Sequence, residues 1–365
     1  MTDETRAAAP DDAAFMRRAL SLAERGWGQT APNPMVGAVV VRDGVVVGEG
    51  WHARYGAAHA EPQALADAGE RARGATMYVT LEPCNHRGQT LPCTDAILAA
   101  GIRRVVAATH DPHTIAAGGA ERLKAAGIAV DIGVEEGAAR EFNASFFHAQ
   151  ASDRTFVRLK LALSLDGALT DAARSHAWLT GPAARREVHR FRADSDAVAV
   201  GIGTVLSDDP LLTVRDVEAP RVPPKRVVFD TSARLPLTSR LVRTARETPT
   251  LVVCWAPDPT HAAALEHAGV RLVHAATLAD ALVALRGEGI RSMLVEGGAA
   301  LAASVIQEQL ADRLIIFRSP IVLGAGALNA FAAVPAAAVE TARRWRVVEM
   351  RRLEDDQMTV FAPPA

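Results

Sequence analysis

Apolar residues in the first part of the chain alternate between a helical period and short buried runs. Residues 13–26 have apolar positions at helical spacing and end on Gly26, which predicts a helix. Two apolar runs flank Asp43-Gly44, a sequence typical of a β-hairpin turn. The same reasoning predicts strands over 36–41, 45–48, 76–81, 104–108 and 128–132, and helices over 61–68, 95–100 and 121–126.

The pattern weakens over residues 140–155, and a strongly apolar strand begins at Phe156. We therefore place a boundary near residue 150 and predict domains over 11–150 and 155–363. In the second domain the pattern predicts strands over 156–163, 196–201, 226–230, 250–254, 271–274, 291–295 and 313–317, with helices between several of them. Strands and helices that alternate in this way are typical of layered α/β domains with a parallel or mixed sheet.

Composition agrees with two globular domains. The chain has 365 residues, of which 49% are hydrophobic and 22% charged. The formal net charge is −2 and no long run of like charges occurs, so we expect no nucleic-acid or membrane partner. The acidic amino-terminal residues lack the apolar segment of a secretory signal. Three cysteines do not suit a disulfide framework, and we expect a cytoplasmic protein with free thiols.

One histidine and two cysteines have the pattern of a catalytic zinc site. The segment HAE contains His59 and Glu61, and two Pro-Cys pairs follow at Cys84 and Cys93. Three protein ligands leave a fourth zinc position for water, and bound zinc lowers the pKa of that water. Glu61 is placed to move the proton from the water to the substrate. This set is typical of zinc deaminases, although the cysteines are separated by eight residues instead of the usual two.

Glycine turns follow apolar runs in the second domain, at 201–203, 297–298 and 324–326. Glycine lets the backbone approach a phosphate closely, and a following helix offers free N–H groups. The dinucleotide fingerprint Gly-x-Gly-x-x-Gly is not completed, because its last position is Leu206. From the residues alone, each of these glycines fits a phosphate-binding turn or an ordinary turn equally well.

Several longer segments resemble those of a known family. The chain is similar over nearly its whole length to the bifunctional riboflavin-biosynthesis deaminase/reductases, in APNPMVGAVVV (31–41), GEGWHARYGAAHAE (48–61), TLEPCNHRGQTLPC (80–93), RLKLALSLDGALT (158–170), residues 177–215 and LVEGGAAL (294–301). The long cysteine spacing is that family's own form. The resemblance implies a cytidine-deaminase-like three-layer α/β domain, followed by a dihydrofolate-reductase-like α/β domain. It also implies zinc-dependent deamination of a diaminopyrimidinone ribosyl phosphate, and then NADPH-dependent reduction of the ribosyl group to ribityl.

The resemblance implies roles for individual residues. In the first domain, Asn33, His52 and His86 would contact the pyrimidine or support the zinc site. In the second domain, the NADPH contacts would be Ala162, Trp178, Thr204, Asp208 and Thr231. The substrate contacts would be Lys160, His176, Arg192, Leu211, Arg215 and Glu296, where arginine suits a phosphate. Asn33 as a turn residue and Trp178 as a packed core aromatic are the alternatives.

Four positions depart from the residues usual in this family: Gln89, Leu91, His113 and His176. Gln89, His113 and His176 keep open a deaminase of another aminopyrimidine or nucleoside, with a reductase-like domain that has drifted. A binding or scaffold protein with vestigial sites is a further alternative, and the intact zinc ligands argue against it. We expect a small-molecule substrate and a homo-oligomer.

Overall fold

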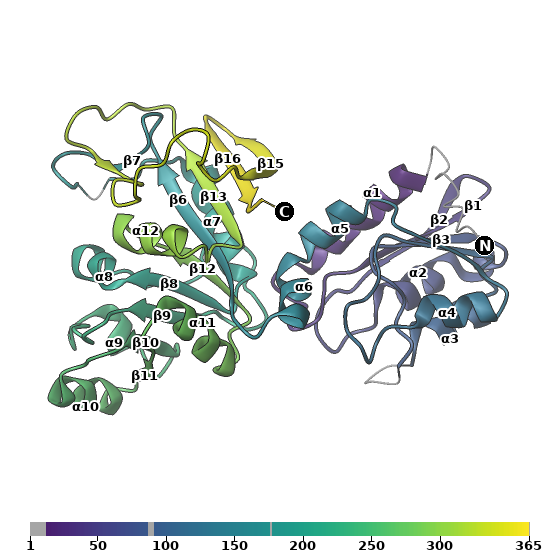
Figure 1. Ribbon diagram of the computed structural model, residues 1–365. Helices are drawn as coiled ribbons and strands as arrows, with labels where there is room; N and C mark the ends of the chain where they lie inside the picture. The colour runs from purple at the N-terminus through teal and green to yellow at the C-terminus, as the bar shows by residue number, and fades with distance from the viewer. Residues whose placement is uncertain (1–11, 87–90, 176, 365) are drawn as a thin grey trace. The chain divides into compact units, whose positions relative to one another are not determined.

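The computed structural model describes residues 12–86, 91–175 and 177–364. The chain forms two compact units, and it passes from the first to the second between Ala151 and Ser152 (Figure 1). No helix within the described ranges is long and apolar enough to cross a membrane.

The first unit is a five-stranded sheet with the order β2-β1-β3-β4-β5. The strand β1 runs antiparallel to β2 and β3, whereas β3, β4 and β5 are parallel. The strands are β1 (Gly37–Arg42), β2 (Val45–Trp51), β3 (Thr76–Val79), β4 (Arg104–Ala107) and β5 (Ala129–Ile132). The helices are α1 (Asp12–Ala23), α2 (Ala60–Ala68), α3 (Cys93–Ala100), α4 (Gly119–Ala125), α5 (Glu136–Phe142) and α6 (Ala144–Ala151).

Helices cover both faces of this sheet. One core joins the sheet to α2, α3 and α4 through residues such as Val40, Ala64 and Leu123. The other joins it to α1 and α5 through Met16, Val39 and Ala139. Val39 and Val40 belong to opposite cores because successive strand residues point to opposite faces. The three-layer α/β arrangement predicted for this domain is confirmed.

Two glycines of β2 let α2 lie directly on the strand. A Cβ atom on Gly48 would stand 2.3 Å from the carbonyl oxygen of Ala64. A Cβ on Gly50 would stand 2.4 Å from the carbonyl oxygen of Ala60. Any side chain at these positions would push α2 away from the sheet, because the obstructing atoms belong to the helix backbone. The glycines therefore set the position at which α2 begins, next to His59.

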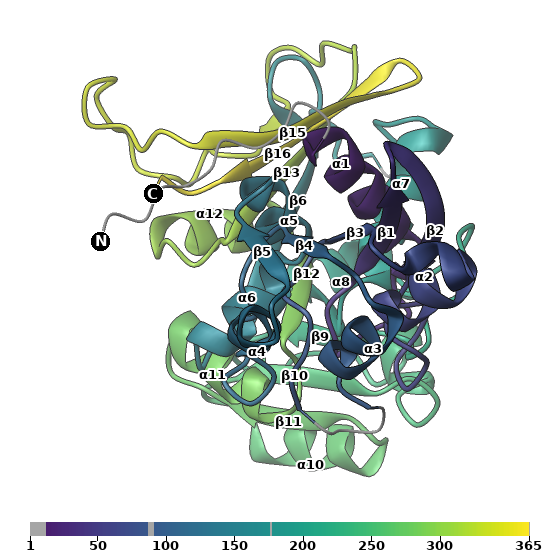
Figure 2. The same cartoon turned by 90° about the vertical axis from the view of Figure 1, so that its right-hand side faces the viewer.

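The second unit is a nine-stranded sheet with the order β11-β10-β9-β8-β12-β6-β13-β16-β15. All strands from β11 to β13 are parallel, and β16 and β15 add an antiparallel pair at one edge (Figure 2). The strands of this sheet are β6 (Phe156–Leu163), β8 (Ala197–Gly201), β9 (Lys225–Phe229), β10 (Thr250–Cys254), β11 (Arg271–His274), β12 (Ser292–Glu296), β13 (Arg313–Arg318), β15 (Arg346–Leu353) and β16 (Asp356–Ala362). A separate short pair joins β7 (Ala168–Thr170) to β14 (Leu328–Asn329).

Helices also pack on the second sheet. They are α7 (Pro182–Ala193), α8 (Ile202–Asp208), α9 (Arg240–Arg243), α10 (Pro259–His267), α11 (Leu278–Gly287) and α12 (Ala299–Gln307). One core holds α11 and α12 against Val157, Leu159 and Leu161 of β6. A second core contains residues of α8, α9 and α10. Lys160 lies between two core residues of β6, so its side chain leaves the sheet on the opposite face.

The predicted strands of both units are confirmed with small shifts at their ends. The stretch 140–155, where the apolar pattern weakens, contains all of α6 and the end of α5. Its aromatic residues Phe146 and Phe147 do not follow a helical stripe, and α6 has no buried residue. The short strands β7 and β14 and the antiparallel pair β15 and β16 lie outside the predicted strands. In β15 most side chains are exposed and show no alternation. The helix α3 begins at Cys93, two residues earlier than predicted.

We predict that Gly50→Ala destabilises the first unit and weakens zinc binding. The added methyl group would collide with the α2 backbone, and overpacking of this kind typically costs about 1–3 kcal/mol. Urea unfolding and metal analysis of the purified protein measure the two effects. Gly137→Ala is the matched control, because nothing lies within 4 Å of its Cβ position in α5 and alanine favours a helix. Equal stability of both variants would contradict this interpretation of the glycine contact.

Candidate active sites

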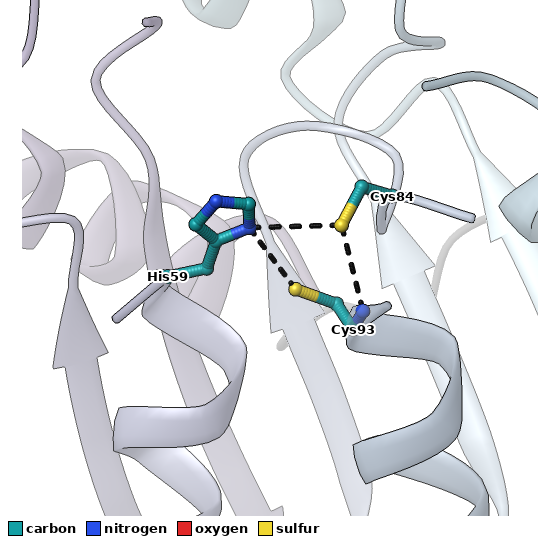
Figure 3. A group of neighbouring side chains, drawn as sticks. All are labelled: His59, Cys84 and Cys93. Atoms are coloured by element: carbon teal, nitrogen blue, oxygen red, sulfur yellow. Dashed lines mark hydrogen bonds between the residues drawn. The ribbon is translucent and has the colours of Figure 1, made fainter. Parts of the chain in front are cut away.

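Three side chains meet at the start of two helices in the first unit. His59 is the residue before α2, Cys93 is the first residue of α3, and Cys84 lies in the loop after β3. Figure 3 shows the three side chains turned toward one another. The Nδ1 atom of His59 lies 3.3 Å from Sγ of Cys93 and 3.6 Å from Sγ of Cys84. All three donor atoms lie within 4.8 Å of one another.

This spacing fits a zinc ion. Zinc binds nitrogen at about 2.0 Å and thiolate sulfur at about 2.3 Å, so a tetrahedral site separates these atoms by roughly 3.5 Å. The observed distances of 3.3 and 3.6 Å lie on either side of that value. The Cys84 sulfur accepts hydrogen bonds from Cys93 and is also hydrogen-bonded to the His59 ring. Together these bonds lower the pKa of the Cys84 thiol to about 4. A thiolate is the form that binds zinc.

Glu61 lies in the first turn of α2 and is only 4% exposed. Burial raises the pKa of its carboxyl group to about 7, and the negative charge of Cys84 acts in the same direction. A carboxyl group with such a pKa can both accept and release a proton near neutral pH. Glu61 therefore has the position and the acidity required of a proton carrier beside the metal ligands.

A cavity of about 320 Å³ opens onto these residues. Asn33, His52 and His86, for which the resemblance implied substrate or zinc-site contacts, all line it together with His59, Glu61 and Cys84. Buried ring nitrogens of three histidines have no partner within the described ranges; they are Nε2 of His52, Nδ1 of His86 and Nδ1 of His113. Buried polar atoms are nearly always hydrogen-bonded in proteins. The cavity is therefore built to receive a polar molecule.

Glu82 lines this cavity and stabilises the backbone around it. Its carboxylate accepts hydrogen bonds from the backbone nitrogen of Ala120 at 2.9 Å and from that of Asp111 at 3.3 Å. It also accepts one from Nδ1 of His110 at 3.0 Å. Burial would raise the pKa of Glu82, but these hydrogen bonds outweigh burial and lower it. The ionised side chain thus joins the loop that carries His113 to the start of α4.

Sequence reasoning missed several lining residues: Tyr55, Glu82, Asp111 and Phe146. Glu82 and Asp111 stand beside prolines just after strands, which is a usable signal for a site at a sheet edge. Phe146 comes from α6, a helix that the apolar pattern did not predict. Gln89 lies outside the described residues.

A second cluster of charged side chains lies in the second unit. Glu296 of β12 is paired in register with Lys160 of β6. Arg192 of α7 donates two hydrogen bonds to the Glu296 carboxylate, at 2.5 and 3.1 Å, and a third to the carbonyl oxygen of Thr213 at 2.7 Å. Burial lowers the pKa of Lys160, although Glu296 opposes this effect. Three of the implied substrate contacts are therefore brought together.

Other implied contacts lie at strand and helix ends. Thr204 lies in α8, and its hydroxyl oxygen would be 3.7 Å from a Cβ on Gly298, the residue before α12. Thr231 follows β9, and its carbonyl oxygen accepts hydrogen bonds from the backbone of residues 255 and 256. Asp208 is the last residue of α8, and Ala162 lies in β6. Leu211 is half-buried, and its neighbour Leu212 is in the core.

Trp178 is 76% exposed, so the alternative of a packed core aromatic is wrong. The guanidinium of Arg185 lies over its ring at 5.3 Å. His176 lies outside the described residues. Asp166, which follows β6 in the segment RLKLALSLDGALT, accepts hydrogen bonds from Ser164 and from the backbone of Leu323 and Gly324.

The start of α12 fits an anionic cofactor such as NADPH. Gly298 is the residue before α12, and the first N–H groups of a helix attract phosphate. Parallel strands end at this edge of the sheet, where α/β proteins commonly bind nucleotides.

Two family profiles match the chain. The cytidine and deoxycytidylate deaminase zinc-binding region matches residues 9–109, and the RibD C-terminal domain matches residues 155–359. The riboflavin biosynthesis protein RibD of Aquifex aeolicus is 43% identical over 86% of this chain and 88% of its own length. That of Escherichia coli is 40% identical over 87% of this chain and 89% of its own.

Solved structures agree. RibD of Acinetobacter baumannii has a TM-score of 0.82 at 37% identity, covering 97% of this chain and 99% of its own. A diaminohydroxyphosphoribosylaminopyrimidine deaminase/5-amino-6-(5-phosphoribosylamino)uracil reductase of Thermotoga maritima also has a TM-score of 0.82, at 34% identity and the same coverage.

Fold and site define a bifunctional enzyme, in which a zinc-dependent cytidine-deaminase-like domain precedes a reductase domain that uses NADPH. The chain belongs to the RibD family of riboflavin biosynthesis proteins.

We predict that Cys93→Ser abolishes stoichiometric zinc binding, because a serine hydroxyl is a poor replacement for a thiolate ligand. Metal analysis after dialysis should find well below one zinc per chain. Cys254→Ser is the matched control, since this free, buried cysteine belongs to the second unit and should leave the zinc content unchanged. Full zinc content in the Cys93 variant would refute the assigned ligand set.

Proposed function

We propose that the chain deaminates 2,5-diamino-6-ribosylamino-4(3H)-pyrimidinone 5′-phosphate in residues 11–150 and reduces the product in residues 155–363. The second step converts the ribosyl group of 5-amino-6-(5-phosphoribosylamino)uracil to a ribityl group. The observation that carries the proposal is that His59, Cys84 and Glu61 line one cavity, with Cys93 beside His59 and Cys84 in the ligand group, and that histidine ring nitrogens of the cavity have no partner among the described residues. The Thermotoga maritima relative is named for the same two activities.

In the deaminase site, His59, Cys84 and Cys93 would hold the metal. When bound, zinc lowers the pKa of a water molecule so that hydroxide is available near neutral pH. The Glu61 carboxylate accepts the proton that the water loses, delivers it to a pyrimidine ring nitrogen, and assists its transfer to the leaving amino group. Oxygen replaces the amino group on the ring carbon, and ammonia leaves. The buried nitrogens of His52, His86 and His113 orient the pyrimidine by hydrogen bonds.

In the reductase site, bound NADPH supplies the hydride. Reduction places that hydride on C1′ of the sugar and a proton on the oxygen released when the ring opens. Lys160 is our candidate for the proton donor, since burial lowers its pKa and makes its ammonium group a stronger acid. Arg192, Leu211, Arg215 and Glu296 bind the substrate, with an arginine on its phosphate. Ala162, Trp178, Thr204, Asp208 and Thr231 contact the cofactor.

A second candidate is deamination of another aminopyrimidine or nucleoside. His113 favours it, because this imidazole lines the cavity at a position where the family usually has asparagine, and an amide and an imidazole offer hydrogen bonds differently. Ammonia release from the diaminopyrimidinone ribosyl phosphate and from cytidine, followed by NADPH consumption on the same sample, separates the two. Release from cytidine alone would reject the first candidate.

We also propose a homo-oligomer in the cytoplasm without a nucleic-acid partner. The three cysteines are free thiols, as expected of a reducing compartment, and the net charge of −2 gives no attraction to phosphate backbones. Val347 and Met350 are exposed on the edge strand β15, where a second copy could bind. The mass in solution tests the oligomer.

We predict that Glu61→Gln lowers the rate of ammonia release by about 10²–10⁴-fold, because glutamine cannot carry the proton. Zinc content and NADPH-dependent reduction of added deaminated substrate should not change, since Glu61 is no ligand and belongs to the other unit. Full ammonia release by this variant would refute the proton-transfer role.

We predict that Asp208→Ala combined with Arg215→Ala lowers kcat/KM for NADPH oxidation by about tenfold or more for each charged contact that is lost. Ammonia release serves as the internal control and should persist. The two single variants should separate a higher KM for NADPH, with Asp208→Ala, from a higher KM for substrate, with Arg215→Ala. Unchanged NADPH oxidation in the double variant would overturn both assignments.

A further inference from the structure

His189 of α7 is buried, with 7% exposure, and its role is not explained by the packing of the helix alone. Its Nδ1 atom accepts a hydrogen bond of 3.1 Å from the backbone nitrogen of Arg215. Arg192, one turn further along α7, donates to the carbonyl oxygen of Thr213 at 2.7 Å. Two side chains of one helix thus hold neighbouring main-chain groups of the segment 211–215.

This segment has little support of its own. It forms neither helix nor strand, and Leu212 adopts a left-handed backbone with φ of 54°. Within the described ranges, no backbone-to-backbone hydrogen bond joins residues 211–215 to other parts of the chain. The side chain of Leu212 is anchored in a core, but the polar main-chain groups depend on α7. A segment of this kind is ordered only as well as its few anchors allow.

We propose that His189 is a positioning residue, whose neutral imidazole holds the segment 211–215 so that Arg215 meets the phosphate of the reductase substrate. This inference rests on the proposed function of Arg215. It extends that function by naming what orients the arginine and when the orientation is lost.

The charges around His189 make the contact sensitive to acid. The charged groups that face it are Arg192 on its own helix, Arg215 on the segment, Asp216 directly after the segment, and Glu296 of β12. Burial first, and then the two arginines, lower the pKa of His189 below its ordinary value of 6.5. The imidazole is therefore neutral at neutral pH, with its hydrogen on Nε2 and Nδ1 free to accept.

Protonation reverses this contact. Both ring nitrogens of a protonated histidine are donors, so Nδ1–H would oppose the Arg215 N–H group. Because the pKa in the folded protein is lowered, the bond is present above that pKa and is lost as the pH falls through it. Substrate affinity of the reductase should fall in the same range, whereas the deaminase site contains no part of this contact.

Two amide variants test the contact. Asparagine carries its carbonyl oxygen on Cγ, as histidine carries Nδ1, so His189→Asn keeps an acceptor near the same place without titrating. Glutamine places its oxygen nearer to the Nε2 position, so His189→Gln should not restore the bond. We expect His189→Gln to raise the KM for the phosphorylated substrate by about three- to tenfold at neutral pH, the effect of one hydrogen bond, with a smaller change in kcat. His189→Asn should stay near the wild-type value.

Three further readings make the test specific. A substrate without the 5′-phosphate should show the same KM in all variants. Hydrogen exchange at the Arg215 amide should be faster in His189→Gln than in His189→Asn. As the pH falls, the wild-type KM should rise more steeply than that of His189→Asn. The substrate phosphate titrates near pH 6 with both proteins, so its effect on KM cancels in the comparison. His267→Gln on α10 is the control for a histidine change on an exposed helix surface.

The outcomes separate the two ideas. If Arg215→Ala raises the KM for the phosphorylated substrate but His189→Gln does not, the positioning role is wrong and the proposed function stands. If Arg215→Ala has no effect on that KM, the phosphate contact itself is wrong. Identical acid behaviour of wild type and His189→Asn would overturn the pH dependence.

Discussion

Three donor atoms must occupy corners of one tetrahedron around a zinc ion, and the layered packing of the first unit satisfies this constraint. His59 and Cys93 are placed by the starts of α2 and α3, two helices that share one face of the sheet. Cys84 reaches the same place in the loop after β3, a central strand of the sheet. The position of α2 in turn depends on Gly48 and Gly50, where the absence of a side chain allows the helix to touch the strand. Two glycines that are not ligands themselves therefore decide whether the donors meet.

The second unit differs from the first in that its candidate site contains buried charged side chains. Lys160 and Glu296 lie on adjacent central strands, and Arg192 reaches them from α7. Removing such groups from water is costly unless each is paired and hydrogen-bonded. Two hydrogen bonds join Arg192 to Glu296. Arg192 donates a third to the carbonyl oxygen of Thr213, which extends the network into an irregular segment. The groups assigned to substrate binding are thus also the groups that order the chain around them.

The two sites differ in how far they are preformed. In the deaminase cavity the ligand distances already match those around a bound zinc ion, and three histidine ring nitrogens of the cavity have no hydrogen-bond partner among the described residues. In the reductase site the implied contacts lie on several elements, including Ala162 in β6, Thr204 in α8 and Thr231 after β9. The implied contacts of this site are therefore spread over several elements. His113, which departs from the usual family residue, lies in the more sharply defined of the two sites.

Period and spacing in the sequence determined most strands, the division into layered α/β domains, and the zinc ligands with Glu61. Each of these follows from local rules, since burial on one face sets the period and metal chemistry selects the residue types. Tertiary structure alone decided the rest. The exposed strand β15 and the helix α6 carry no periodic apolar face, so no local signal marks them. The partners of Glu82, the pairing of Arg192 with Glu296 and the contact between His189 and Arg215 join residues 26 to 104 positions apart. For the zinc site, the sequence named the donors, and the packing of α2 and α3 on the sheet brought them within bonding range of one ion.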